Sequence, residues 1–189
     1  MARRTALVLA LAITGALTLG IVVSIGAADS GKRNFKAKRM LASFEVPAAS
    51  SDASGSFEAT LQNDTTVSYT VEYSGLDSAV TQSHIHFAQK FASGGISVWL
   101  CQTTTNQAPE SVRELTPTCP GPNGGEVSDT FTAAEVIGPA NQGISATEFS
   151  ALLEAMREGL TYANVHSTLI PAGEVRGQIH AGGGGNDDD

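Results

Sequence analysis

Residues 66–73 read TVSYTVEY, with apolar side chains at the odd positions and polar side chains at the even positions. A period of two places alternate side chains on opposite faces of an extended chain, so this stretch predicts a β-strand with one buried face. The preceding residues Phe57–Gln62 alternate in the same way, and Gln62–Thr65 has the composition of a tight turn. The two runs therefore predict a β-hairpin.

Further segments repeat this alternation on both sides of the hairpin. They are Met40–Val46, Ile96–Cys101, Tyr162–Thr168 and Glu174–His180. Together with frequent turn residues, the pattern indicates about eight short strands. We therefore expect an all-β fold, an antiparallel Greek-key sandwich or barrel.

One segment has a helical period instead. Apolar side chains recur there at intervals of three and four residues, at Phe149, Leu152, Leu153 and Met156. Ser145 and Glu148 form a capping-box pattern in front of this run, and Gly159 is a typical residue behind a helix. The pattern predicts one short amphipathic helix inserted near residues 146–158, packed over an edge of the core.

The two ends of the chain differ from this β-rich centre. Residues 1–28 have a short basic start, an apolar run and small residues at the end, which predicts a secretory signal peptide. The alternative is an uncleaved anchor, because the apolar run is long enough to span a bilayer. A basic segment follows at residues 29–39, and residues 181–189 form a Gly/Asp tail that we expect to be flexible. Residues 40–180 are then expected to form one domain that is secreted, periplasmic or on the cell surface.

The charge balance excludes one class of partner. The chain has 19 acidic and 11 basic residues and a formal net charge of −8. Proteins that bind nucleic acids present a basic surface, so we expect no nucleic-acid partner. We expect contact with a membrane only through an uncleaved N-terminal segment.

The chain has two cysteines, Cys101 and Cys119. In an oxidising compartment such a pair predicts a structural disulfide, which here closes a loop of about 18 residues. A zinc site would need more ligands nearby, and no histidine lies between the two. A redox pair would have a closer spacing.

The histidines are the residues with the most chemical potential, and there are four: His84, His86, His166 and His180. His84 and His86 are two residues apart on a predicted strand, so their rings share one face with about 6.6 Å between their backbone positions. That distance lets two imidazoles bind the same metal ion. On the strand that follows the helix, Asn164 and His166 share the polar face.

The last strand has its own polar face, which includes Arg176 and His180. If the last two strands pair symmetrically about Pro171, His166 lies opposite Arg176, and Asn164 lies opposite Gln178. The polar faces could then converge on one patch made of His84, His86, His166 and Arg176. Three interpretations of the histidines stay open: surface or hydrogen-bonded structural residues, ligands of a metal or small molecule, and catalytic residues. No signature of a serine hydrolase, zinc protease or nucleotide-binding loop occurs, and we expect no enzymatic activity.

Four motifs occur in a recognisable order: FEVP at 44–47, SHIH at 83–86, YANVHS at 162–167 and PAGEVRGQI at 171–179. This order, from about Met40 to His180, resembles the CHRD (chordin) domain family. The resemblance implies a secreted or surface-exposed β-domain. In chordin itself, such domains belong to an extracellular protein that binds growth factors.

The same motifs are remotely similar to copper/zinc superoxide dismutases. That similarity implies that His84, His86 and His166 are metal ligands on the outside of a Greek-key barrel, and that Arg176 steers anions. Two departures argue against dismutase activity. The loop Gln102–Pro120 has no further histidine, and the zinc-binding loop of the dismutases is missing. His180 is a weaker candidate for an additional ligand. Three histidines would still suit copper or zinc.

Two functions follow as hypotheses. The first is an exported CHRD domain with a non-enzymatic role in extracellular binding, adhesion or structure, whose protein or matrix partner is unknown. The alternative is a periplasmic or extracellular protein that binds copper or zinc at a dismutase-like histidine site. In that case, Asn164 and Arg176 lie around the ligands.

Overall fold

The computed structural model describes residues 32–182, which fold into eight antiparallel strands and one α-helix. The strands are β1 (Asn34–Leu41), β2 (Ser54–Asn63), β3 (Thr66–Ser74), β4 (Val80–Phe87), β5 (Ile96–Gln102), β6 (Gly125–Phe131), β7 (Thr161–Ser167) and β8 (Val175–Ala181), and the helix is α1 (Phe149–Arg157). The all-β prediction with about eight strands is confirmed. The predicted signal peptide, residues 1–28, lies outside the described residues, as does most of the predicted C-terminal tail.

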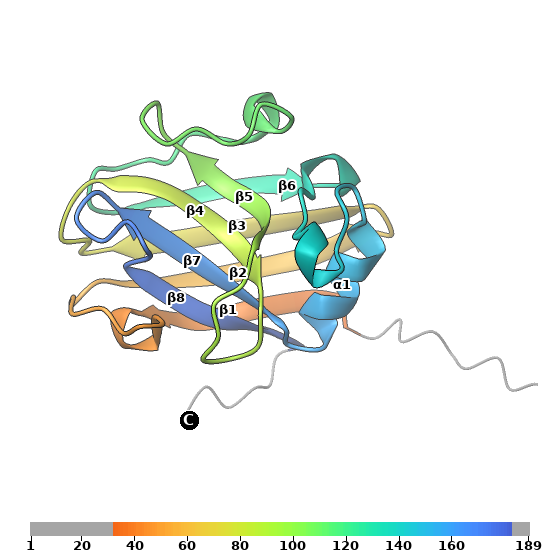
Figure 1. Ribbon diagram of the computed structural model, residues 1–189, viewed down its shortest axis with the longest axis horizontal. Helices are drawn as coiled ribbons and strands as arrows, with labels where there is room; N and C mark the ends of the chain where they lie inside the picture. The colour runs from red at the N-terminus through yellow and green to blue at the C-terminus, as the bar shows by residue number, and fades with distance from the viewer. Residues whose placement is uncertain (1–31, 183–189) are drawn as a thin grey trace, which may run out of the picture.

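The strands form one sheet in the order β5-β4-β7-β8-β1-β2-β3-β6. The sheet folds over so that β5, β4, β7 and β8 lie in front of the other four strands (Figure 1). After the β2–β3 hairpin the chain crosses to β4 in the opposite layer, and β6 later returns to pair with β3. These crossovers give the predicted Greek-key connections.

The two edge strands, β5 and β6, leave a seam that side chains close. Tyr69 on β3 donates a hydrogen bond to the carbonyl oxygen of Leu100 on β5, at 2.7 Å. The predicted disulfide between Cys101 and Cys119 is present and joins the end of β5 to the loop before β6. The sheet is therefore a nearly closed barrel.

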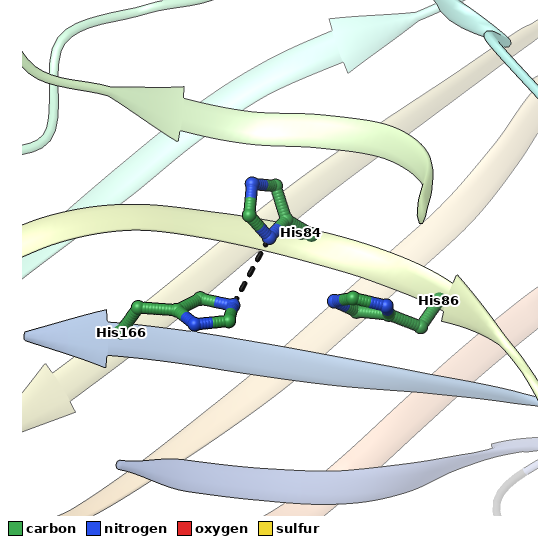
Figure 2. Close-up of side chains that lie close together, drawn as sticks. All are labelled: His84, His86 and His166. Atoms are coloured by element: carbon green, nitrogen blue, oxygen red, sulfur yellow. Dashed lines mark hydrogen bonds between the residues drawn. The ribbon is translucent and has the colours of Figure 1, made fainter. Parts of the chain in front are cut away.

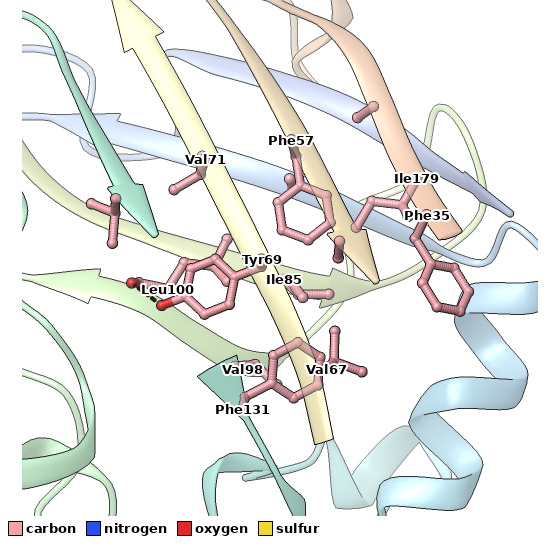
Figure 3. Packing of buried hydrophobic residues seen from close by; sticks show 14 of the residues in the cluster. Phe35, Phe57, Val67, Tyr69, Val71, Ile85, Val98, Leu100, Phe131 and Ile179 are labelled. Atoms are coloured by element: carbon pink, nitrogen blue, oxygen red, sulfur yellow. Dashed lines mark hydrogen bonds between the residues drawn. The ribbon is translucent and has the colours of Figure 1, made fainter. Parts of the chain in front are cut away.

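The inward faces of the strands supply the core (Figure 3). In the β3 stretch with which the prediction began, all four odd residues are buried: Val67, Tyr69, Val71 and Tyr73. The Tyr69 ring lies between the rings of Phe57 and Phe131, with centroid separations of 6.5 and 6.2 Å. The predicted hairpin turn is also confirmed, because Asn63 pairs with Thr66.

The helix starts later than its sequence pattern predicts. Thr147 has a positive φ of 66° and donates its backbone N–H to the carbonyl of Val136, so it cannot belong to a regular helix. One half of the predicted capping box does form, because the Glu148 carboxylate accepts the backbone N–H of Ser145 at 2.8 Å. Gly159 ends the helix as predicted, with a φ of 69°. Within residues 32–182, no helix is both long and apolar enough to span a membrane.

The first strand lies earlier in the chain than predicted. Met40–Val46 was expected to be extended, but β1 ends at Leu41 and the next three residues form a 3₁₀ turn. The inward residues of β1 are Phe35, Ala37 and Met40, with a bulge between the last two. The bulge interrupts the alternation of this strand. Because its outer face carries basic residues, the sequence pattern predicted a separate basic segment at residues 29–39.

The pairing of β7 with β8 differs from the predicted register by two residues. Asn164 lies opposite Arg176, whereas the symmetric turn predicted His166 at that position. The turn is centred on residue 170 and not on Pro171, because Val165 pairs with Val175. A shift of two keeps every side chain on its predicted face.

Candidate metal centre

The candidate site lies on the outer face of the front layer. Ile85 on β4 and Val165 on β7 point into the core, so their neighbours in the chain point outward. The register places His84 beside Asn164, and His86 beside Tyr162, across the β4–β7 pair. His84, His86 and His166 therefore share the outward face of two adjacent strands, as the alternation in the sequence predicted.

This outward face is covered by loops. The loop of residues 88–95, between β4 and β5, is bound to the face by four side chains. His86, Arg176 and Gln178 donate to the carbonyls of Gly94, Ala92 and Ala88, and the Tyr162 hydroxyl accepts from the Gly94 N–H. On the other side, His166 donates to the carbonyl of Pro171 in the β7–β8 loop. As a result the exposed fractions of His84, His86 and His166 are only 0%, 8% and 5%.

The three histidines form one cluster. One nitrogen from each ring lies within 4.8 Å of one nitrogen from each of the others. Nδ1 of His84 is 3.1 Å from Nε2 of His166. Figure 2 shows that the rings of His86 and His166 point toward each other, with His84 beside the gap between them. This convergence is the arrangement that three ligands of one ion require.

The hydrogen bonds fix which nitrogens carry protons. A carbonyl oxygen can only accept, so the Nδ1 atoms of His86 and His166, at 2.9 and 3.0 Å from their carbonyl partners, must each carry the proton. Their Nε2 atoms then present lone pairs to the cluster. The buried Nε2 atoms of His84 and His86 have no hydrogen-bond partner among the described residues.

Burial keeps the cluster uncharged. Desolvation lowers the pKa of His86 to about 4, an effect that the Gly94 carbonyl opposes and His166 and Arg176 reinforce. Desolvation also lowers the pKa of His166 to about 4, against the opposing effect of its bond to Pro171. For His84, burial and the two neighbouring histidines hold the pKa well below its usual value. All three rings are therefore neutral at physiological pH, which is the form that binds metals.

Aromatic residues surround the cluster on two sides. The Tyr162 ring stacks on His86 with a centroid separation of 4.7 Å and an interplanar angle of 2°. The Arg176 guanidinium lies 3.7 Å from the centre of the same tyrosine ring. Trp99 on β5 meets the edge of His84, with their ring centroids 4.2 Å apart. These contacts restrict how far His84 and His86 can rotate.

A buried carboxyl group lies next to Arg176. Glu45, from the segment after β1, accepts a hydrogen bond from the Asn164 amide. Burial raises the pKa of Glu45 to about 7, although Arg176 and Asn164 both act to lower it. Gly173 is required here, because a Cβ at this position would lie 2.8 Å from the Glu45 carboxylate. Asn164 and Arg176 thus lie around the histidines. Tyr162 separates Arg176 from the cluster.

His180 is not part of the cluster. It lies four residues beyond Arg176 on β8, opposite Lys36 of β1, which corresponds to about 13 Å along the strand. Sequence reasoning missed Tyr162, Trp99 and Glu45. Tyr162 could have been found, because it shares the parity of Asn164 and His166 on β7. Glu45 could not, because it reaches the site from outside the strands.

Three comparisons relate the chain to known proteins. Residues 37–179 match the protein family described as "CHRD domain". The curated protein sequences contain no match. A solved structure of Candida albicans superoxide dismutase 5 with Cu(II) is similar with a TM-score of 0.42 and 15% identity, over 84% of this chain and 99% of that one. A mutant of the same enzyme gives a TM-score of 0.40 and 16% identity, over 84% and 98%.

Proposed function

The chain belongs to the CHRD domain family, and we propose that it is an exported member that binds one copper or zinc ion through His84, His86 and His166. The observation that carries this proposal is the convergence of three buried, neutral imidazoles, with one nitrogen of each ring within 4.8 Å of one nitrogen of each of the others. Three histidines are a known ligand set for zinc, and imidazole also suits copper.

The donor atoms fit such an ion. Nε2 of His86 and Nε2 of His166 already present lone pairs, held in place by the bonds of their Nδ1 atoms to backbone carbonyls. His84 offers Nδ1 once its proton moves to Nε2, since a neutral imidazole can carry its proton on either nitrogen. Two nitrogens bound to one ion at 2.0–2.1 Å lie at most about 4.2 Å apart, so the three ligand nitrogens, now within 4.8 Å of one another, need to move only slightly.

Without a bound ion, the buried histidine nitrogens would lower the stability of the protein. A buried polar atom without a partner destabilises a protein by about 1–3 kcal/mol, and His84 and His86 each hold one such nitrogen within the described part of the chain. A bound ion would give the Nε2 atom of His86 a partner. This supports a binding role over a purely structural one.

Export is supported by the disulfide between Cys101 and Cys119. Such bonds persist in oxidising compartments and are rare in the cytosol. The expected role in adhesion or in binding an extracellular partner stays a prediction. A bound copper or zinc ion would supply Lewis acidity or, for copper, electron transfer, while the three histidines would orient it.

Metal analysis of the untagged full-length protein tests the proposal, followed by thermal unfolding with and without Cu(II) or Zn(II). We expect one equivalent of metal and, at a free metal concentration 100 times the dissociation constant, about 2.7 kcal/mol of added stability. Trp99, the only tryptophan, lies against His84, so its fluorescence should report binding directly.

The variant His84→Ala/His86→Ala should lose both the bound metal and the stabilisation. The matched control is His180→Ala, which removes the histidine outside the cluster and should keep both. Equal metal-induced stabilisation of the double variant and the wild type would refute the proposal. If the double variant does not unfold cooperatively, His166→Gln, which keeps a polar side chain, replaces it.

A further inference from the structure

We propose that the three-histidine cluster prefers the monovalent cuprous ion, Cu(I), to the divalent ions Zn(II) and Cu(II). This inference rests on the metal-binding function proposed above and specifies which ion and which charge the site selects. Three features of the described residues lead to it: the charge of the donors, the burial of the cluster, and the buried cation nearby.

The donors carry no negative charge. The cluster consists of three neutral imidazoles, and within residues 32–182 no Asp, Glu or Cys joins it. A divalent ion would therefore keep two uncompensated charges in the site, and a cuprous ion only one. Because the cost of removing an ion from water rises with the square of its charge, this difference strongly favours the monovalent ion.

Because the cluster is buried, water does not reduce the cost of desolvating a bound ion. His84 is fully buried, and the loop over residues 88–95 is held down on His86 through the Gly94 carbonyl. A zinc ion normally completes a tetrahedron with a fourth ligand, and Cu(II) favours four ligands in a tetragonal arrangement. His180 lies elsewhere on β8, and the Tyr162 hydroxyl already accepts the Gly94 N–H, so the described residues offer three donors. Three-coordinate binding suits a cuprous ion best.

A buried positive charge, that of Arg176, acts on the cluster. The strand order β4-β7-β8 places Tyr162 between His86 and Arg176, and the guanidinium lies 3.7 Å from the tyrosine ring centre. Arg176 is 3% exposed, so water screens its charge weakly. Its field disfavours a doubly charged ion at the histidines more than a singly charged one. The buried Glu45 carboxyl interacts with Arg176, and it offsets this field when it is ionised.

Competition titrations on the full-length protein without oxygen test this preference. Competition with a colorimetric cuprous chelator measures the dissociation constant of the protein for Cu(I), and competition with a zinc chelator measures that for Zn(II). We expect the constant for Cu(I) to be at least about 100-fold lower. We also expect the bound copper couple to have a higher reduction potential than aqueous copper.

The outcomes separate this inference from the proposed function. Zinc binding that is equal to or tighter than cuprous binding overturns the preference and leaves the metal site standing. Binding of neither metal overturns the proposed function itself, and the preference with it.

Two variants test the electrostatic step in opposite directions. Arg176→Met keeps an apolar stem beside Tyr162 and removes the charge, so the preference for Cu(I) over Zn(II) should narrow by about tenfold. Glu45→Gln keeps the acceptor for Asn164 and leaves Arg176 unopposed, so at pH 8 the preference should widen. A preference that widens in Arg176→Met, or that is unchanged in both variants, contradicts the role of Arg176.

Discussion

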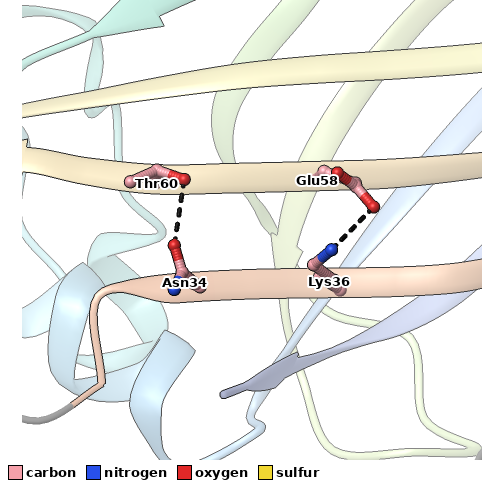
Figure 4. Close-up of polar contacts among 4 residues, drawn as sticks. All are labelled: Asn34, Lys36, Glu58 and Thr60. Carbon is pink, nitrogen blue, oxygen red and sulfur yellow. Dashed lines mark hydrogen bonds and ion pairs between the residues drawn. The ribbon is translucent and has the colours of Figure 1, made fainter. Parts of the chain in front are cut away.

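The two halves of the sheet share one alternating pattern but differ in what lies outside it. On β1 and β2 the outward residues face solvent, where Lys36 pairs with Glu58 at 2.9 Å and Asn34 with Thr60 at 3.1 Å (Figure 4). On β4 and β7 the outward residues include His84, His86 and His166, and loops cover them. Both halves contribute apolar inward residues to the core.

This difference separates two questions that alternation alone merges. The alternating pattern shows which side chains point away from the core. It does not show whether those side chains are exposed to solvent. Polar residues that point outward and are still buried must find partners, and the histidine cluster is one of the places where this requirement is met incompletely. The three predictions that follow test the inner face, the covered outer face and the exposed outer face, in order of expected effect.

Truncation on the shared inner face should have the largest effect. Phe57→Ala removes a fully buried ring that stacks against Tyr69, and we expect a loss of about 3–5 kcal/mol in the free energy of unfolding. Chemical denaturation measures this loss. The matched control is Phe91→Ala, whose ring is 68% exposed and whose removal should change stability by less than about 0.5 kcal/mol. A loss below about 1 kcal/mol for Phe57→Ala would show that the inward ring of Phe57 does not contribute to the core as described.

On the covered outer face, the charge of Glu45 should make stability depend on pH. Its pKa is about 7 when folded and near 4.5 when unfolded, so the folded state holds its proton more tightly. The associated stability is present below pH 4.5 and is lost as the pH rises to 7, by about 3 kcal/mol in total. Glu45→Gln lacks this loss and should be more stable than the wild type at pH 8, but similar to it near pH 4.5.

Denaturant unfolding of both proteins at the two pH values measures the Glu45 effect, and the difference between the proteins cancels the titration of all other groups. A difference that does not change with pH would mean that the carboxyl group is hydrated in the folded protein. In that case the outer face of the front layer would resemble that of β1 and β2 after all.

On the exposed outer face, the smallest effect is expected. Lys36 and Glu58 are 35% and 61% exposed, and pairs of this kind contribute about 0.2–1 kcal/mol. Lys36→Gln should therefore cost less than about 1 kcal/mol at low salt and nothing measurable at 1 M salt, where charges are screened within about 3 Å. Unfolding at both salt concentrations measures it. A cost that persists at high salt would indicate that Lys36 contributes through packing.

The sequence was most informative where pattern and chemistry agreed. The β2–β3 hairpin, the disulfide and the common face of His84 and His86 could each be predicted, because they depend on neighbours in the chain or on residue parity. The same holds for Gly159 at the end of α1. Boundaries failed where backbone geometry overrode the pattern, as at Thr147 and at the bulge in β1.

The parts of the site that the sequence did not reveal come from tertiary contacts. Nothing local to Glu45 indicates that it will meet Asn164, since the two are more than a hundred residues apart in the chain. Nor does an alternating strand reveal that the loop of residues 88–95 folds over its outer face. The burial of the histidines, and hence their neutral state, therefore required the three-dimensional structure.

The pairing of β1 with β8 also determines how the domain would respond to a pulling force. Phe35 lies opposite Ala181, and Gly182 donates to the carbonyl of Asn34, so residues 34 and 182 lie at the same end of one antiparallel pair. Tension between these two points would peel the strands apart and break their hydrogen bonds one after another instead of all at once. The domain should consequently open at this pair under a modest load, while the β4–β7 pair with its histidines stays intact.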